Sequence, residues 1–161
     1  MHDNIHAIKA LINAGFVRRC HTVPCTDPQT TGHHSFEVAL LVQYIYPECT
    51  KAALLRALTH DSAESWVGDT PGNAKWASAP LTAALQAMED EYEAKHGIDY
   101  DLSLEEGMAV KCADLISLLL YTDHMLAMGN TYFLPFRDRI EKWFLTHPQH
   151  VAAFPKVKEF L

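Results

Sequence analysis

Apolar residues recur along most of this chain with the spacing of an amphipathic α-helix. No segment alternates apolar and polar residues for long enough to predict a β-strand. The pattern therefore predicts an all-α fold, a helical bundle of about six helices. They are expected at residues 3–14, 33–46, 50–64, 80–96, 104–129 and 135–146.

Local signals mark several ends of these helices. Asp3 is the predicted cap of the first helix. Pro80 stands at the start of the fourth helix, where a proline fits, and Gly97 closes that helix. Ser103 and Glu106 form a capping-box pattern, which predicts that the longest helix begins there.

Two segments are predicted to lie outside the helices. Residues 18–31 contain two prolines and two cysteines and show no helical period, which predicts a long loop. Long loops in compact proteins often carry functional residues. Residues 68–72, Gly-Asp-Thr-Pro-Gly, have the composition of a tight turn.

Length and charge restrict the possible functions. The 161 residues, of which 48% are apolar and 20% charged, are typical of one soluble domain covering residues 1–161. The formal charge of −7 argues against binding to nucleic acid polymers or to anionic membranes, which require a basic surface. A small phosphate-bearing ligand remains compatible, because it needs only a local cluster of positive charge.

Cysteine usage and the apolar runs indicate the cytoplasm. The N-terminus lacks the pattern of a signal peptide, and no apolar run approaches the length of a membrane span. The four cysteines do not resemble the framework of a secreted domain, so we expect reduced thiols. They are Cys20, Cys25, Cys49 and Cys112.

Four residues are candidate metal ligands. His60 and Asp61 are adjacent on a predicted helix, where neighbouring side chains diverge by about 100°, so they can share one ion only near a helix end or across a groove. Such a pair alone is more often a surface feature. His34 follows the long loop, and Asp114 lies in a mostly apolar stretch, where an unpaired aspartate is costly to bury. Two imidazoles and two carboxylates suit manganese, cobalt, nickel, iron or zinc.

The order of these residues resembles the HD-domain phosphohydrolase superfamily. The closest likeness is to the branch that contains the bacterial 5′-deoxynucleotidases and compact phage dATP triphosphohydrolases. The matching segments cover most of residues 18–131. They are Arg19, Gly32-His33-His34-Ser35, His60-Asp61-Ser62-Ala63-Glu64, Gly68-Asp69-Thr70-Pro71 with Lys75, Lys111-Cys112-Ala113-Asp114 and Gly129-Asn130.

The resemblance implies a role for each matching position. Glu64 would place or deprotonate the attacking water, and Asp69 would lie near the sugar and reacting phosphate or help to hold further ions. Arg19 and Lys75 would contact phosphate, and Cys20 would lie beside the nucleoside. The metal ligands would be His34, His60, Asp61 and Asp114.

The sequence departs from the family pattern at two positions. The family usually has an acidic residue where His33 stands and a bulky aromatic residue where Cys20 stands. The second position adjoins the nucleoside pocket, so base and sugar preference cannot simply be transferred.

The implied activity is cleavage of the 5′ phosphoester of a deoxynucleotide by a divalent ion such as zinc, cobalt or manganese, with additional magnesium left open. The leading expectation is hydrolysis of dATP to deoxyadenosine and triphosphate, and the alternative is a 5′-deoxynucleotidase that releases phosphate. The resemblance also implies a homo-oligomer in the cytoplasm of a bacterium, with phage encoding as an option. It implies no nucleic acid polymer and no membrane as partners.

Several other interpretations remain open. Cys20 and Cys25 with His33 and His34 are a weak candidate for a structural zinc site, since their spacing is not a common one. The segment from His60 to Glu64 lacks the two-histidine pattern of a metalloprotease. A non-catalytic nucleotide-binding HD module is the main non-enzymatic alternative.

For several further polar and aromatic residues, the sequence allows either a functional or a structural interpretation. Arg18 is either a surface residue or a second phosphate contact. Trp66 and Trp76 flank the predicted turn, where they wall a base pocket or pack in the core. His124 is more typical of a packed or solvated helix residue than of a metal ligand.

Overall fold

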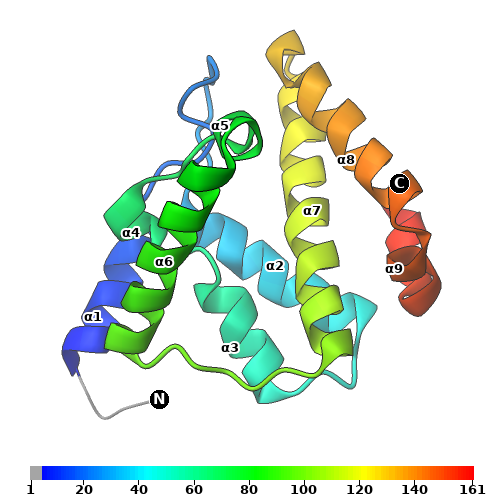
Figure 1. Ribbon diagram of the computed structural model, residues 1–161. Coiled ribbons are helices and arrows are strands. Elements are labelled where there is room, and N and C mark those ends of the chain that lie inside the picture. Colours follow the sequence, from blue (N-terminus) through cyan, green and yellow to red (C-terminus); the bar gives the residue numbers. More distant parts are fainter. Residues whose placement is uncertain (1–4) are drawn as a thin grey trace.

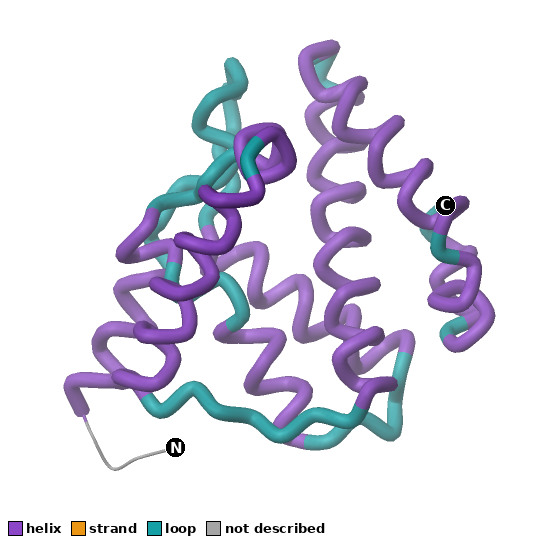
Figure 2. The backbone as a smooth tube through the Cα atoms, viewed as in Figure 1, coloured by secondary structure: helices purple, strands orange, loops and turns teal. Residues whose placement is uncertain are grey.

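The computed structural model describes residues 5–161, so the predicted Asp3 cap lies outside the described residues. The described chain is helical, and its only strand-like pairing is an isolated bridge between Arg18 and Thr30 (Figures 1 and 2). The all-α prediction is confirmed. The α-helices are α1 (Ile5–Ala14), α2 (Thr31–Ile45), α3 (Lys51–Thr59), α4 (Glu64–Val67), α5 (Gly72–Ala77), α6 (Ala79–His96), α7 (Leu104–Ala127), α8 (Leu134–Thr146) and α9 (Pro148–Ala153).

The cap signals account for the ends of the long helices. The Ser103 hydroxyl accepts from the Glu106 amide while Glu106 accepts from the Ser103 amide, so the predicted capping box begins α7. Gly97 closes α6 in a left-handed conformation, φ 66°. The expected start of α2 at His33 was two residues late, because the Thr30 side chain accepts from the His33 amide and caps the helix earlier.

The prediction of one helix from 50 to 64 was wrong. Helix α3 ends at Thr59, and Glu64 begins the separate helix α4. Two hydroxyls bond to carbonyls at this break: Thr59 Oγ1 donates to Leu55 O at 2.8 Å, and Ser62 Oγ donates to Thr59 O at 2.7 Å. Side-chain bonds of this kind compete with helix continuation.

Within residues 5–161, the structure adds three short α-helices and two 3₁₀-helices to the six expected helices. Helix α4 follows the break after α3, and α5 follows the Gly-Asp-Thr-Pro turn. The chain after Pro148, expected as a tail, forms α9 and the 3₁₀-helix η2 (Pro155–Glu159). A second 3₁₀-helix, η1 (Thr131–Phe133), joins α7 to α8.

The main core lies between α2, α3 and α7, with α8, α9 and η2 packed against them. Figure 1 shows α1 and α6 on one side of the long helix α7, and α8 and α9 on the other. Apolar residues of α2 recur at helical spacing on the face toward α7, and Val38, Val42 and Ile116 are fully enclosed there. This packing fixes the positions of the helices that carry His34 and Asp114.

A glycine contact ties α1 to the start of α2. The Gly32 amide donates to Gly15 O at 3.0 Å, and a Cβ added at Gly32 would lie 3.0 Å from that oxygen and 3.1 Å from Gly15 Cα. The two backbones can approach this closely only because neither residue has a side chain.

Within residues 5–161, none of the helices combines the length and the apolar character needed to cross a membrane.

Candidate metal centre

His34, His60 and Asp61 form a group that could hold a metal ion, the only such group in residues 5–161. The Nε2 atoms of His34 and His60 lie 3.2 Å apart, and Asp61 Oδ2 lies 3.5 Å from the first and 3.4 Å from the second. Asp114 Oδ1 lies 3.3 Å from His34 Nε2 and 4.0 Å from His60 Nε2. Three of the four predicted ligands therefore form this group, and Asp114 lies within 4.0 Å of both histidines without belonging to it.

The break after α3 allows neighbouring residues to meet at this point. His60 is the C-cap residue of α3, and the turn that follows directs the Asp61 carboxylate toward the same place. His34 comes from the first turn of α2, and Asp114 from the middle of α7. His60 and Asp61 therefore lie at a helix end, which is one of the two arrangements in which neighbouring residues can approach the same point.

Hydrogen bonds fix the protonated nitrogen of each imidazole. His60 Nδ1 lies 2.8 Å from Ala57 O, and a carbonyl can only accept, so this nitrogen carries the proton. His34 Nδ1 lies 2.8 Å from Ser117 Oγ, whose own proton goes to Glu37 Oε2 at 2.7 Å. The Ser117 oxygen therefore accepts from His34 Nδ1.

With the Nδ1 atoms protonated, the Nε2 lone pairs of His34 and His60 face each other at 3.2 Å. Two lone pairs at this distance repel unless a positive charge lies between them. A shared proton would supply such a charge, and so would a metal ion. The adjacent carboxylates of Asp61 and Asp114 favour the greater charge of a divalent ion.

The spacing of the donor atoms fits a first-row ion. Bonds of about 2.0–2.1 Å to nitrogen or oxygen place tetrahedral ligands about 3.3–3.4 Å apart. The distances of 3.2, 3.3, 3.4 and 3.5 Å among these donors lie close to that value. The 4.0 Å between His60 and Asp114 is wider, and Asp114 lies outside the three-residue group whose donor atoms are all within 4.8 Å of one another.

The electrostatic surroundings keep the ligands in the forms that bind cations. Burial, followed by the charge of Arg19, lowers the pKa of His34 and favours the neutral ring. Burial alone would raise the pKa of Asp61, but His60 and Arg19 outweigh it and lower that pKa to about 2. Burial opposes ionisation of Asp114 too, but the charge of Lys111, whose Nζ lies 2.8 Å from Asp114 Oδ2, outweighs it and holds the pKa of Asp114 well below its usual value.

Arg19 and Glu64 lie beside this cluster. The buried Arg19 guanidinium donates to Asp61 Oδ2 and lies 3.7 Å from Glu64 Oε1. Glu64 Oε2 accepts from Thr31 Oγ1 at 2.8 Å, which orients the carboxylate. Burial and the charge of Asp61 raise the pKa of Glu64 to about 8, against the opposing effect of Arg19. This carboxyl group is therefore suited to exchange a proton near neutral pH.

Asp69 joins the tight turn to the long loop. Its Oδ2 accepts from the Cys20 amide at 2.6 Å, and Cys20 has a left-handed backbone, φ 54°. The charge of Asp69 also contributes to the raised pKa values of Arg19 and Glu64, so it lies near them. The structure thus places Asp69 and the Cys20 backbone at the edge of the cluster.

The remaining predicted residues make contacts with α6 and α8. Lys75 Nζ lies 3.8 Å from Glu89 Oε1 on α6. Trp66 packs edge-on against Tyr92 of α6, which favours packing over a base pocket. The other tryptophan, Trp76, lies under the guanidinium of Arg139 from α8, 4.3 Å from ring centre to Cζ.

Two further residues have surface positions. Arg18 is exposed at the bridge with Thr30 and does not share the buried position of Arg19. His124 is exposed and lies 3.4 Å from Asp27, so its reading as a helix-surface residue agrees with its position.

The structure does not assemble the zinc site considered for two cysteines and two histidines. His34 faces His60, whereas the exposed His33 lies 3.3 Å from Glu37. Cys25 Sγ lies 2.8 Å from the Tyr121 hydroxyl. Adjacent histidines on α2 point in different directions, so all four side chains cannot meet at one ion.

Sequence reasoning missed the residues that support His34. Ser117 and Glu37 form its hydrogen-bonded relay, and Gln29 Nε2 donates to the same Glu37 oxygen at 2.9 Å. The usable signal was spacing: Glu37 lies three residues after His34, and Ser117 three after Asp114, so each shares a helix face with a ligand.

A comparison of the sequence with models of protein families finds no match, and a comparison with curated proteins finds no significant match.

Proposed function

We propose that this chain is a metal-dependent phosphohydrolase that cleaves the 5′ phosphoester of deoxynucleotides, with dATP as substrate and triphosphate as product. The observation that carries the proposal is the pair of unprotonated Nε2 atoms, 3.2 Å apart, flanked by two carboxylates and a partly buried glutamate. A binding protein needs a cation site but has no need of a proton-accepting carboxylate next to it.

Assignment to the HD-domain superfamily is part of this proposal. It is supported by the order of the donors, His34 on α2, His60-Asp61 at the end of α3 and Asp114 on α7, in an all-α chain. Arg19 reaches from the long loop to the carboxylates of Asp61 and Glu64, which is consistent with the same family pattern.

A bound divalent ion would polarise the phosphoryl oxygens and lower the pKa of a coordinated water. The proposed metal is a first-row ion such as manganese, cobalt or zinc, because the donors are two nitrogens and two oxygens. Glu64, held by Thr31, accepts the proton of the attacking water. Arg19 exchanges its carboxylate partners for phosphoryl oxygens and stabilises the charge that develops on them.

One observation favours the second candidate, a 5′-deoxynucleotidase. The cations near the cluster already pair with carboxylates: Arg19 with Asp61, Lys111 with Asp114, and Lys75 with Glu89. A triphosphate carries more negative charge than a monophosphate and requires more of these pairs to open. The number of phosphates on the substrate is therefore a question for product analysis.

The deciding experiment incubates the purified protein with dATP or dAMP and added manganese or cobalt, and separates the products. Triphosphate from dATP supports the leading proposal, and phosphate from dAMP supports the second. Glu64→Gln should retain the metal and lose turnover, whereas Asp61→Asn should lose both. Absence of turnover with either nucleotide by metal-loaded protein would favour a non-catalytic module.

A further inference from the structure

A short strand-like pairing sets the direction of the Arg19 side chain. The Arg19 amide donates to Gln29 O at 2.9 Å, next to the isolated bridge at Arg18. Neighbouring side chains of an extended segment point to opposite faces, which agrees with the exposed position of Arg18 and the buried position of Arg19. The backbone conformation at this point therefore decides which of the two arginines faces the carboxylates of the cluster.

The chain turns directly after Arg19. Cys20 has a left-handed backbone, φ 54°, and it is the one described residue other than glycine with a positive φ. The Val23 amide closes the turn by donating to Cys20 O at 3.0 Å. A left-handed backbone at a residue with a side chain costs free energy and persists only where other contacts hold it. The conformation of Cys20 therefore depends on its surroundings.

Asp69 holds this turn from another part of the chain. Its Oδ2 accepts from the Cys20 amide at 2.6 Å, and a bond this short is typical of an ionised acceptor. Asp69 directly follows Gly68, the C-cap residue of α4, and α4 begins with Glu64, whose Oε1 lies 3.7 Å from the Arg19 guanidinium. Arg19 and Cys20 are thus each in contact with one end of the same short helical segment.

We propose that Asp69 is a positioning residue, which holds the left-handed Cys20 and thereby directs Arg19 to the carboxylates of the cluster. The inference rests on the proposed function for what Arg19 then binds, a phosphoryl group of the substrate. It differs from the role that the resemblance implies for Asp69, which is contact with sugar and phosphate or with further ions. An ion requires the charge of a carboxylate, whereas the Cys20 amide requires only an acceptor oxygen. Asparagine retains such an oxygen, and alanine does not.

The first measurement follows the Arg19 side chain by NMR and is independent of activity. Arg19 Nε is buried and, among residues 5–161, has no hydrogen-bond partner, so its proton should exchange slowly with water while the side chain stays in place. Asp69→Ala should speed this exchange by about tenfold, the factor expected for loss of one hydrogen bond to a charged group, and should shift the Cys20 amide resonance. Asp69→Asn should retain most of the protection.

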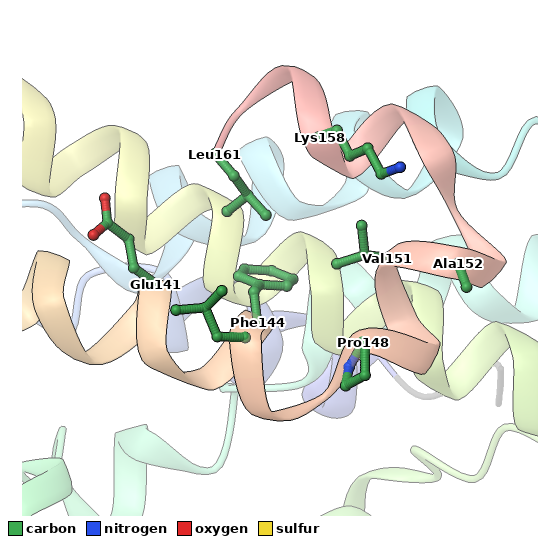
Figure 3. Close-up of a pocket in the computed structure, with 8 residues that line it drawn as sticks. Glu141, Phe144, Pro148, Val151, Ala152, Lys158 and Leu161 are labelled. Atoms are coloured by element: carbon green, nitrogen blue, oxygen red, sulfur yellow. The ribbon is translucent and has the colours of Figure 1, made fainter.

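The second measurement is the affinity of the metal-loaded protein for inorganic phosphate, by calorimetry. Asp69→Ala should weaken binding by about tenfold, and Asp69→Asn should retain most of the affinity. His21→Ala is the matched control, because the half-exposed His21 ring lies 3.8 Å from the same Asp69 oxygen and its loss leaves the bond to the Cys20 amide in place. A second control is Leu161→Ala, in the apolar hollow of about 620 Å³ formed by α8, α9 and the segment around η2 (Figure 3). Both controls should bind phosphate like wild type.

A double-mutant cycle tests whether Asp69 acts through Cys20. Glycine adopts the left-handed backbone without strain, so Asp69→Ala should speed Arg19 exchange less in a Cys20→Gly background than in wild type. An equal effect in both backgrounds, an unchanged Arg19 signal in Asp69→Ala, or an Asp69→Asn variant as impaired as Asp69→Ala would each overturn the proposal. A wild type that binds no phosphate but shows Asp69-dependent exchange would count against the proposed function and support the positioning role.

Discussion

Replacing Ser117 by alanine removes the relay that orients His34. The Ser117 side chain is completely enclosed, and its hydroxyl accepts from His34 Nδ1 at 2.8 Å and donates to Glu37 Oε2 at 2.7 Å. Loss of a hydrogen-bond partner of a metal-binding histidine typically weakens metal affinity by about 10- to 100-fold, roughly 1.4–2.7 kcal/mol. In Ser117→Ala the His34 proton has no acceptor and can move to Nε2, the nitrogen that would bind the ion.

The assay is competition between the metal-free protein and a fluorescent chelator for cobalt or manganese. Thr122→Val is the matched control, since Thr122 is also fully buried on α7 and, among the described residues, its hydroxyl has no hydrogen-bond partner. It should bind metal like wild type. If Ser117→Ala also binds like wild type, the relay does not set the His34 tautomer and the reasoning fails.

Three further changes test other parts of the structure. Tyr121→Phe removes the hydroxyl that donates to Asp27 O at 2.9 Å in the long loop, and calorimetry should show a loss of about 1–3 kcal/mol of unfolding free energy. Gly32→Ala should lower the thermal midpoint, because its Cβ would meet Gly15 backbone atoms at 3.0 and 3.1 Å. The control is Gly107→Ala, in open space within α7, which should raise the free energy of unfolding by about 0.5–1 kcal/mol. Equal shifts in the two variants would contradict the argument that Gly32 and Gly15 approach too closely for a side chain. Hydrogen bonds from Thr50 and from the Ser103 amide lower the pKa of Glu106 to about 2, so its stabilising effect is complete above the unfolded pKa of about 4.3 and disappears as the pH falls toward 2. The thermal midpoint of Glu106→Gln should therefore lie below that of wild type at pH 7 and approach it at pH 2. A difference in thermal midpoint that stays the same at both pH values would contradict the lowered pKa of Glu106.

The sequence predicts the fold well where local chemistry decides the outcome. Ser103 and Glu106 begin α7, and Gly97 ends α6, because each signal acts within a few residues. The break at Thr59 was missed for the opposite reason. Residues 59–62 contain no proline or glycine that would end a helix, and only the competing hydroxyls of Thr59 and Ser62 indicate that the helix stops.

The candidate site could be predicted in its ligands but not in their support. His34, His60 and Asp61 are recognisable by residue type and order, and the structure brings them together. Spacing places Glu37 on the helix face of His34 and Ser117 on that of Asp114, but the two residues are 80 positions apart and no local pattern links them to each other. Tertiary packing of α2 against α7 creates this contact, so it becomes visible only when the helices are placed.

The candidate metal-binding side chains come from three elements, α2, the end of α3, and α7, and this affects how the protein would acquire its metal. These same helices enclose the main apolar core through Val42, Ala57 and Ile116, so their mutual positions depend on packing and not on an ion. Unlike a zinc finger, which is unfolded without metal, this chain should keep its fold when a chelator removes the ion. A site that exists before the metal arrives can bind and release first-row ions reversibly. The identity of the bound ion would then depend on which ions are available in the cell and not on the folding reaction.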